Sequence, residues 1–464
     1  MNKTIWNKFK KKYFLFLVFL IGFIIRIIPE IKAHPYPIGY DVINYYIPKL
    51  IHVQNLGTFF IENTNPYLFI LYISNLVLNN PQITTSISIS FMYGLFSISL
   101  YLFIKKITIN QYHSFFVTIF VIIQIPVLRT SWDLHKDIFA LTILFVIFYI
   151  LLNYKIKLTQ LVIILFLTII TIITDIMVSL LLICTLMIYF IRKKREFKYL
   201  SLLILGSYLL IFSFSIENNN IFNNIVKLVS NHDIINSNYN QVNLIITFVL
   251  LYIFILPTFI VGLFKLKNDL IYISLAITLI GSFSWIFISD TDLLLPDRWI
   301  ILSTIFSSII SGYGITYLLK KIRKENIQKF SAILILSPFI IMSISYMLLS
   351  SDQNIIPLQL FSENIKYFVP MSMQFNSIDI KDNQDLIKII DWININTENN
   401  ATIIVDKHLR GWMSILLKEN RTFQFNEHNI NKNSTYIVYL NSMDKRSGIE
   451  NLKIFGIFQI GKIS

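Results

Sequence analysis

The chain has 464 residues, of which 55% are hydrophobic and only 14% are charged. Because a soluble domain carries roughly 25% charged residues, this composition excludes an ordinary soluble protein and indicates a protein of the lipid bilayer. The net charge of +14 does not indicate a nucleic-acid partner, since the basic residues concentrate in short loops between apolar runs, as they do in membrane proteins.

The apolar residues form long runs, such as 13–28, 158–174 and 331–349. Helical runs of about 17–25 apolar residues match the roughly 30 Å hydrocarbon core of a bilayer. These runs are apolar on every face, whereas the strands of a membrane barrel alternate apolar and polar side chains. The sequence therefore predicts an all-α polytopic membrane protein.

We predict about eleven transmembrane helices. The first is retained and not cleaved as a signal peptide, because no small-residue cleavage site follows its apolar run. The predicted spans are 13–28, 83–104, 112–128, 138–153, 158–174, 176–191, 199–215, 244–264, 270–288, 299–319 and 331–350.

The basic residues set the predicted orientation in the cell (plasma) membrane. Lys and Arg gather in the N-terminal segment and in every second loop, which the positive-inside rule assigns to the cytoplasm. The N-terminus is then cytoplasmic and the C-terminus external. Members of these basic loops include Lys105, Lys106, Lys155, Lys157, Arg192, Lys193, Lys265, Lys267, Lys320 and Lys321.

A long first external loop, 29–82, separates the first two predicted spans. It contains a short apolar segment, 66–78, with asparagines around it. Counting this segment as a span would place Lys105 and Lys106 outside, so we interpret 48–80 as interfacial or re-entrant helices. The loop thus belongs to a transmembrane domain that covers residues 1–350.

Residues 351–464 are predicted to form a small external α/β domain. Helical spacing marks 382–397, and short apolar runs at 401–405, 436–440 and 454–460 indicate strands, with an amphipathic helix from Gly411. This domain is too small to bury much core alone, so we expect it to lean on the external loops.

Acidic residues are scarce and fall mostly at the predicted external ends of spans. A carboxylate beside the bilayer needs a partner, water or a metal ion, so several on one face would form an acidic cavity. The alternative is that external loops are simply polar. The residues are Glu30, Asp41, Asp133, Asp137, Asp175, Asp290, Asp292 and Asp297.

The most informative stretch is 34–50, HPYPIGYDVINYYIPKL. Asp41 follows Gly-Tyr and precedes Tyr45 and Tyr46, just beyond the first span. A carboxylate poised beside the membrane is suited to accept a proton as a general base. The alternative is an aspartate that caps a helix starting at Val42.

Two further stretches carry charged residues at predicted external ends. In RTSWDLHKDIF, Asp133 and Asp137 are four residues apart and would share one helix face, or else are acids in the first turn of a helix. In DTDLLLPDRW, Arg298 lies at the mouth of a span, where it suits a lipid phosphate or ordinary snorkelling. Asp290 and Asp292 of that stretch have the spacing of a metal-binding Asp-x-Asp pair.

The first-loop motif, with the span pattern and the C-terminal tail, resembles the GT-C superfamily of membrane glycosyltransferases, in its archaeal and bacterial form. The resemblance implies an inverting transfer of one sugar from a polyprenyl-phosphate donor to a glycan, lipid or protein acceptor on the outer face. It implies that Asp41 is the general base and that an optional divalent metal ion binds Asp133 and Asp137. The substrate-binding residues that it implies are Tyr45, Asp133, His135, Lys136 and Arg298.

Other functions are weighed against this one. The Trp-Trp-Asp-Tyr-Gly motif of oligosaccharyltransferases is missing, which argues against transfer of whole oligosaccharides to asparagine. A transporter would place charges in mid-span and show broken helices in paired halves, whereas the predicted spans are nearly free of charge. A polysaccharide polymerase or a scaffold would share the topology without using Asp41 as a base.

Overall fold

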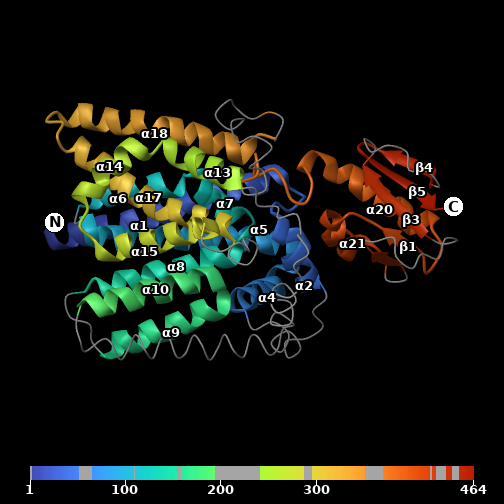
Figure 1. The fold of residues 1–464 in the computed structure, drawn as a ribbon, viewed down its shortest axis with the longest axis horizontal. Helices are drawn as coiled ribbons and strands as arrows, with labels where there is room; N and C mark the ends of the chain where they lie inside the picture. The colour runs from blue at the N-terminus through green and yellow to red at the C-terminus, as the bar shows by residue number, and fades with distance from the viewer. Residues whose placement is uncertain are drawn as a thin grey trace.

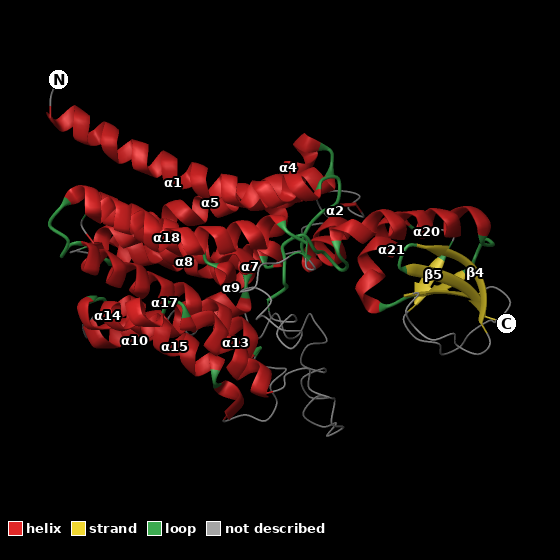
Figure 2. Ribbon diagram, turned by 90° about the horizontal axis from the view of Figure 1, so that it is seen from above, coloured by secondary structure: helices red, strands yellow, loops and turns green. Residues whose placement is uncertain are grey.

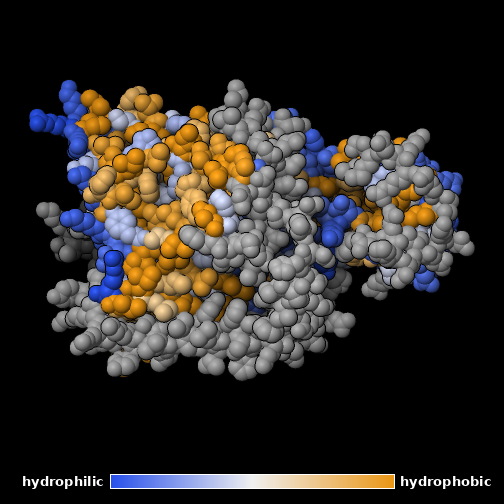
Figure 3. Space-filling model, in the orientation of Figure 1, coloured by the Kyte–Doolittle hydropathy of each residue, from blue (hydrophilic) through white to orange (hydrophobic). Residues whose placement is uncertain are grey.

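The computed structural model describes residues 3–51, 65–108, 110–153, 158–193, 241–286, 295–350, 353, 369–418, 421–424, 435–440 and 449–463. It contains a bundle of long helices and a small domain with a sheet, which projects from one end of the bundle (Figures 1 and 2). Figure 3 shows a broad apolar surface along the helices of the bundle. The prediction of helices with a small C-terminal α/β domain is therefore confirmed.

The helices of the bundle run back and forth between its two ends (Figure 1). Between the first two long helices lie a π-helical turn, η1 (Val42–Tyr46), and a short helix, α2 (Ile47–Ile51). The bundle helices are α1 (Lys3–Ala33), α4 (Pro66–Leu78), α5 (Pro81–Thr108), α6 (Gln111–Ile122), α7 (Ile125–Asp133), α8 (His135–Leu151), α9 (Leu158–Thr174), α10 (Ile176–Lys193), α13 (Gln241–Ile253), α14 (Leu256–Lys265), α15 (Asp269–Ser282), α17 (Pro296–Leu319) and α18 (Glu325–Leu348).

Several of these helices are long and apolar enough to cross a bilayer. Within the described residues there are four, α1, α5, α17 and α18, or up to six if each of two bent helix pairs counts as one span. Shorter apolar helices, such as α9 and α10, accompany them. The helices thus indicate a membrane protein, but the count of eleven spans is not confirmed. The predicted span 199–215 lies outside the described residues.

Two predicted spans, 112–128 and 244–264, each coincide with a bent pair of helices, which is either one broken span or a re-entrant loop. The pair α6 and α7 bends by 61°, and the pair α13 and α14 bends by 72°. A proline follows each break, Pro126 or Pro257, in the first turn of the next helix, where its missing N–H is tolerated. Two side chains donate hydrogen bonds to backbone carbonyls at the first break. Tyr93 donates to Ile122 O at 2.6 Å, and Ser343 donates to Ile123 O.

The short helix α4 packs beside the first turns of α5. Thr84 of α5 donates to Asn75 Oδ1 of α4 at 3.1 Å, and Asn65, before α4, donates to Thr174 O at the end of α9 at 2.8 Å. The 13 residues of α4 span about 20 Å, less than the roughly 30 Å core of a bilayer. These contacts agree with an interfacial or re-entrant segment.

The C-terminal domain holds a five-stranded sheet in the order β2-β1-β3-β5-β4. Strand β1 (Thr402–Ile404) pairs in parallel with β2 (Thr422–Gln424) and β3 (Thr435–Leu440), and β4 (Ile449–Phe455) and β5 (Phe458–Ile463) form a hairpin. The predicted strand 454–460 was wrong, because Gly456, at φ +55°, turns the chain inside it.

Two helices complete the domain. In α20 (Asn383–Asn396), the predicted apolar face is buried, including Leu386 and Ile390. The second helix, α21 (Arg410–Leu416), begins at the predicted amphipathic stretch. Short 3-10 turns precede them, η5 (Ile380–Asp382) and η6 (Lys407–Leu409).

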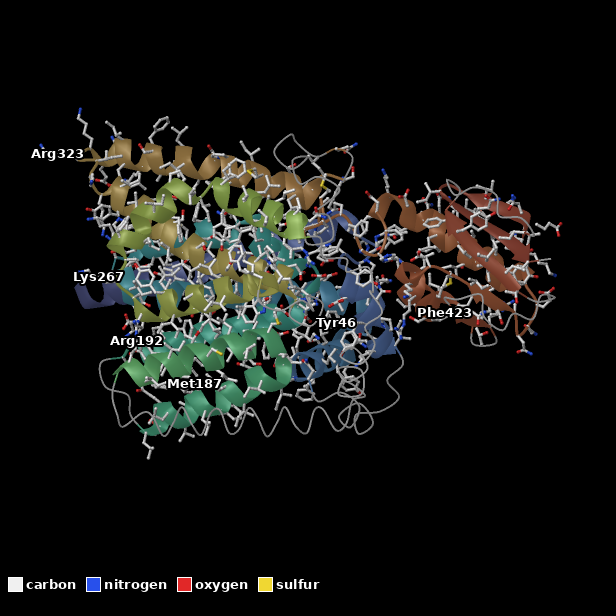
Figure 4. All side chains as sticks on the ribbon, viewed as in Figure 1. Tyr46, Met187, Arg192, Lys267, Arg323 and Phe423 are labelled. Atoms are coloured by element: carbon white, nitrogen blue, oxygen red, sulfur yellow. The ribbon has the colours of Figure 1, made fainter. Side chains whose placement is uncertain are left out.

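The two ends of the bundle differ in charge. Arg192, Lys267 and Arg323 lie at the end opposite to the sheet domain, whereas Tyr46 of the first loop lies beside that domain (Figure 4). We call these the basic end and the loop end. Basic residues from three predicted cytoplasmic loops thus gather at one end, as the charge pattern requires.

The two ends are expected to face opposite sides of the membrane. Arg323→Cys, at the basic end, and Lys407→Cys, in the sheet domain, change exposed residues. In a Cys184→Ser background, which removes the single native cysteine, a membrane-impermeant maleimide added to intact cells should label only Lys407→Cys. Labelling of Arg323→Cys only after cell lysis completes the test, and labelling of both variants from one side would contradict it.

Candidate active site

The first loop turns at Gly39, the glycine of the Gly-Tyr-Asp motif. Gly39 has φ +98°, which favours glycine, and a Cβ there would collide with the carbonyl oxygen of Trp132. The Gly39 N–H donates to Phe375 O at 3.0 Å, and the Trp132 indole N–H donates to the same oxygen at 2.9 Å. Glycine is therefore needed at this position for the loop to approach α7.

Asp41 lies two residues after this turn and leads into η1. Its backbone is helical, with φ −67° and ψ −24°, and among the described residues its side chain makes no capping hydrogen bond. The alternative that Asp41 is a helix cap was therefore wrong. Such π-helical turns are rare and frequently occur at functional sites.

Asp133 and Asp137 lie on different helices. Asp133 is the last residue of α7, where it forms a buried ion pair with Arg129, and α8 begins at His135. The expectation of a shared helix face was wrong, because the helix breaks at Leu134. Asp137 is in the first turn of α8, as the alternative predicted. It is only 2% exposed, and its Oδ1 has no hydrogen-bond partner within the described residues.

Tyr45 lies between two cations. Lys49 Nζ is 4.4 Å from the centre of the Tyr45 ring, and Lys136 Nζ, from α8, is 5.4 Å from it. The sequence predicted Tyr45 and Lys136 as neighbours of one substrate, and the structure brings them together. Lys49 was not predicted, although its spacing of four residues from Tyr45 was a usable signal.

His135 is buried inside the junction of α7 and α8. Its ring stacks on Tyr46 at 5.1 Å, and its Nδ1 is 3.1 Å from the Tyr67 hydroxyl of α4. The ring thus connects the first loop to the bundle. Its predicted contact with substrate stays a prediction.

Arg298 is half-buried in the first turn of α17. Within the described residues its guanidinium makes no hydrogen bond or ion pair, but it interacts electrostatically with Asp133, Asp137 and Asp175. Asp175 joins α9 to α10 and accepts from Val178 N at 2.8 Å. The ends of five helices, α7, α8, α9, α10 and α17, thus contribute to this charged cluster. Asp290 and Asp292 lie outside the described residues.

The charges around Asp41 come from separate segments of the chain. Burial raises the pKa of the Asp41 carboxyl, and the charges of Arg298, Lys136 and Arg129 oppose that rise. These cations come from α17, α8 and α7. Cations from two of the stretches singled out in the sequence, 129–139 and 290–299, therefore act on the carboxyl group of the third, 34–50.

A buried ion pair in α1 supports this arrangement. Arg26 Nη2 lies 2.7 Å from Glu30 Oε1. Arg26 Nε donates to Ser131 O of α7 at 3.1 Å, and the Ser86 hydroxyl of α5 donates to Glu30 Oε2 at 2.8 Å. The sequence placed Glu30 beyond the first predicted span, 13–28, but α1 continues past Pro29 to Ala33. The spacing of four residues between Arg26 and Glu30 was the signal that could have identified the pair.

The predicted metal ion has an incomplete set of ligands in the described part of the chain. No group of three or more His, Cys, Asp or Glu side chains there could hold a metal ion. Asp133 is already engaged by Arg129. The metal at Asp133 and Asp137 stays a prediction.

Comparison of the chain with protein-family models and with curated proteins gives no match. The function therefore has to be inferred from the chemistry of this site.

Gly39→Ala is expected to displace the Asp41 loop. The new methyl group must push the loop away from α7, and the backbone is strained at positive φ, so the folded state should lose about 1–3 kcal/mol. Thermal unfolding of the purified protein in detergent measures the loss. The control is Gly312→Ala, whose Cβ would meet the side chains of Val117, at 3.1 Å, and Phe120, at 3.3 Å, and would not collide with a backbone carbonyl. Equal stability of the two variants would contradict the tight contact at Gly39.

Proposed function

We propose that this chain is a GT-C-type membrane glycosyltransferase, which moves one sugar from a polyprenyl-phosphate donor to a glycan, lipid or protein acceptor. The proposal rests on the Asp41 carboxyl, which makes no capping hydrogen bond and interacts electrostatically with Arg298, Lys136 and Arg129. Transfer from a phosphate-linked sugar needs a base for the acceptor and positive charge for the leaving phosphate. Both requirements meet at the loop end of the bundle.

The reaction is a single displacement. Asp41 accepts the proton of the acceptor hydroxyl, whose oxygen attacks the anomeric carbon of the donor sugar. The bond from that carbon to the phosphate oxygen breaks, and the polyprenyl phosphate leaves with the electron pair. One displacement inverts the anomeric configuration. The raised pKa of the Asp41 carboxyl suits this role, because a general base works best when its pKa approaches the working pH.

The donor phosphate lies near Arg298 and Lys136 in this proposal. Arg298 is the stronger candidate, since it is half-buried and its guanidinium is not committed to an ion pair within the described residues. Guanidinium groups bind phosphate in a planar, two-pronged manner. The lipid tail would lie along the apolar surface of the helices (Figure 3).

The finer topology belongs to the same proposal. The chain would cross the cell membrane about eleven times, with a cytoplasmic N-terminus and the loop end outside. The gathering of basic residues at the opposite end supports this orientation (Figure 4). The apolar helices support the bilayer as its environment.

A transporter is the alternative that one observation favours, because two helix pairs are broken. The cavity between the breaks argues against it. This cavity has a volume of about 30 Å³, and its lining residues, such as Pro126, Leu251 and Phe339, are mostly apolar. It holds little more than one water molecule. A polymerase or a scaffold differs from the proposed enzyme in that it would not use Asp41 as a base.

Asp41→Asn should abolish most of the transfer. The amide keeps the size of the side chain but removes the base, so the rate should fall by roughly 10²–10⁴-fold, with donor binding preserved. Arg298→Ala should show the opposite pattern, with weaker donor binding as its main defect. Purified protein is given a panel of radiolabelled polyprenyl-phosphate hexoses, with a membrane extract as acceptor, and both binding and transfer are followed.

The matched control is Asp391→Asn, which changes an exposed carboxylate of the sheet domain. It should leave both binding and transfer unchanged. Near-normal turnover in folded Asp41→Asn would remove Asp41 from the mechanism and would favour the polymerase or scaffold alternative.

The acidic limb of the pH–rate profile should report on Asp41. Burial raises the pKa of this carboxyl above the ordinary aspartate value of about 4. As the pH is lowered, kcat/KM should therefore begin to fall at a higher pH than an ordinary aspartate would give, because the base becomes protonated. Lys136→Gln removes a charge that opposes the rise, so the limb should move to higher pH. Lys32→Gln, at an exposed position of α1, is the control. A limb that stays in place in Lys136→Gln would separate this lysine from the base.

A further inference from the structure

The sheet domain packs against the first loop beside Asp41. The Gly411 N–H of α21 donates to Asn44 Oδ1 of η1 at 2.8 Å, and a Cβ on Gly411 would collide with the carbonyl oxygen of Ile43. The next residue, Trp412, has its ring 6.4 Å from that of Tyr36. The predicted contact of the domain with the first loop is therefore confirmed, and it is made three residues from Asp41.

This docking brings the segment before α21 across Tyr40. The His408 ring meets the Tyr40 ring edge-on at 5.9 Å. Burial raises the pKa of the Tyr40 hydroxyl, the charges of Asp41 and Asp406 raise it further, and Arg410 opposes them. The groups of the sheet domain and the proposed base thus act on the same phenol ring.

Four side chains of this segment are exposed, and we call them the polar rim: Asp406, Lys407, His408 and Arg410. Leu409, between them, is buried and anchors the segment. The Asp406 carboxylate accepts from the His408 N–H at 2.8 Å, so the turn is held by its own first residue. The rim therefore offers both hydrogen-bond donors and acceptors on a fixed backbone, next to a half-buried aromatic ring.

These groups suit a ligand with many hydroxyl groups. A hydroxyl both donates and accepts, so it can pair with a carboxylate, an imidazole and a guanidinium in turn. The rim combines one carboxylate with two cations, so its net charge is small and a strongly charged ligand gains little from it. An apolar chain would have to desolvate all four side chains without replacing their hydrogen bonds.

We infer that the polar rim and Tyr40 form an acceptor subsite that binds a glycan and presents one of its hydroxyl groups to Asp41. The inference rests on the proposed function and narrows its acceptor from a glycan, lipid or protein to a glycan. The donor side of the reaction is then formed by the bundle and the acceptor side by the sheet domain.

Binding is tested without turnover. Saturation-transfer NMR is recorded on the full-length protein in detergent with a mixture of methyl hexopyranosides and short neutral hexose oligosaccharides. The unsubstituted chain should show saturation transfer to the oligosaccharides. His408→Ala and Arg410→Ala should each weaken binding by about tenfold, the usual effect of losing a hydrogen bond to a charged or polar side chain. Lys453→Ala, at an exposed position of β4, is the control and should bind normally.

Kinetics add a second readout. In the transfer assay both rim variants should raise the KM for the acceptor by about tenfold, with kcat and the KM for the donor nearly unchanged, because the rim binds the acceptor equally in the ground and transition states. No binding by the unsubstituted chain, or unchanged binding in both rim variants, would overturn the inference. Failure of the proposed function has a different signature, in which no polyprenyl-phosphate hexose is consumed while rim-dependent glycan binding persists.

Discussion

The carbonyl group of Phe375 is the acceptor on which the site depends. It accepts from the Gly39 N–H of the first loop and from the Trp132 indole of α7. The residues on either side extend the same connection, because Gln374 donates to Pro29 O at the end of α1 and Asn376 donates to Pro37 O. The side chains of Gln374 and Asn376 are buried, so each would be costly to leave without its partner. The short segment 374–376, between the bundle and the sheet domain, therefore fixes the positions of α1, the first loop and α7 relative to one another.

The charges at the loop end divide into two kinds. Arg26 with Glu30 and Arg129 with Asp133 are buried pairs within single helices. Buried pairs gain little net stability, because desolvation offsets their attraction, so we attribute their value to the groups they hold. Arg26 fixes the Ser131 carbonyl and thus the end of α7. The two residues of each pair neutralise each other, and Arg298 and Lys136 are the cations that we propose for the donor phosphate.

The sequence predicted much of this architecture and less of the site geometry. Apolar runs and helical spacing report on local structure, so they located the helices of the bundle and α20. The Gly-Tyr-Asp motif was recognised by its resemblance to the first loop of GT-C enzymes, and the structure gives its glycine a local backbone reason, a positive φ. The helix breaks were missed although each has a proline signal at Pro126 or Pro257, because an apolar run looks the same whether the helix is straight or bent.

The long-range contacts were beyond the sequence for a different reason. Asn376 and Pro37 are 339 residues apart, and Gly411 and Asn44 are 367 residues apart. Neither pair belongs to a periodic pattern, since each is a single hydrogen bond between irregular segments. Trp412 does not complete the Trp-Trp-Asp-Tyr-Gly motif, yet its neighbour Gly411 makes the contact with the first loop. The contact depends on the Gly411 N–H and on the absence of a side chain there. Neither property can be read from composition or hydropathy.

The position of Asp41 between two parts of the chain has a chemical consequence. A base for sugar transfer must reach the acceptor on one side and lie within the field of the donor's phosphate on the other. Asp41 meets the second requirement through Arg298 and Lys136 of the bundle, and its neighbour Tyr40 touches His408 of the sheet domain. A carboxylate on a membrane helix would meet only the donor, and one on the sheet would meet only the acceptor. The first loop is the segment that is fixed to both, through Gly39 on the bundle side and Asn44 on the domain side. In the proposed reaction, the same turn that positions Asp41 would therefore also set the distance between the two substrates.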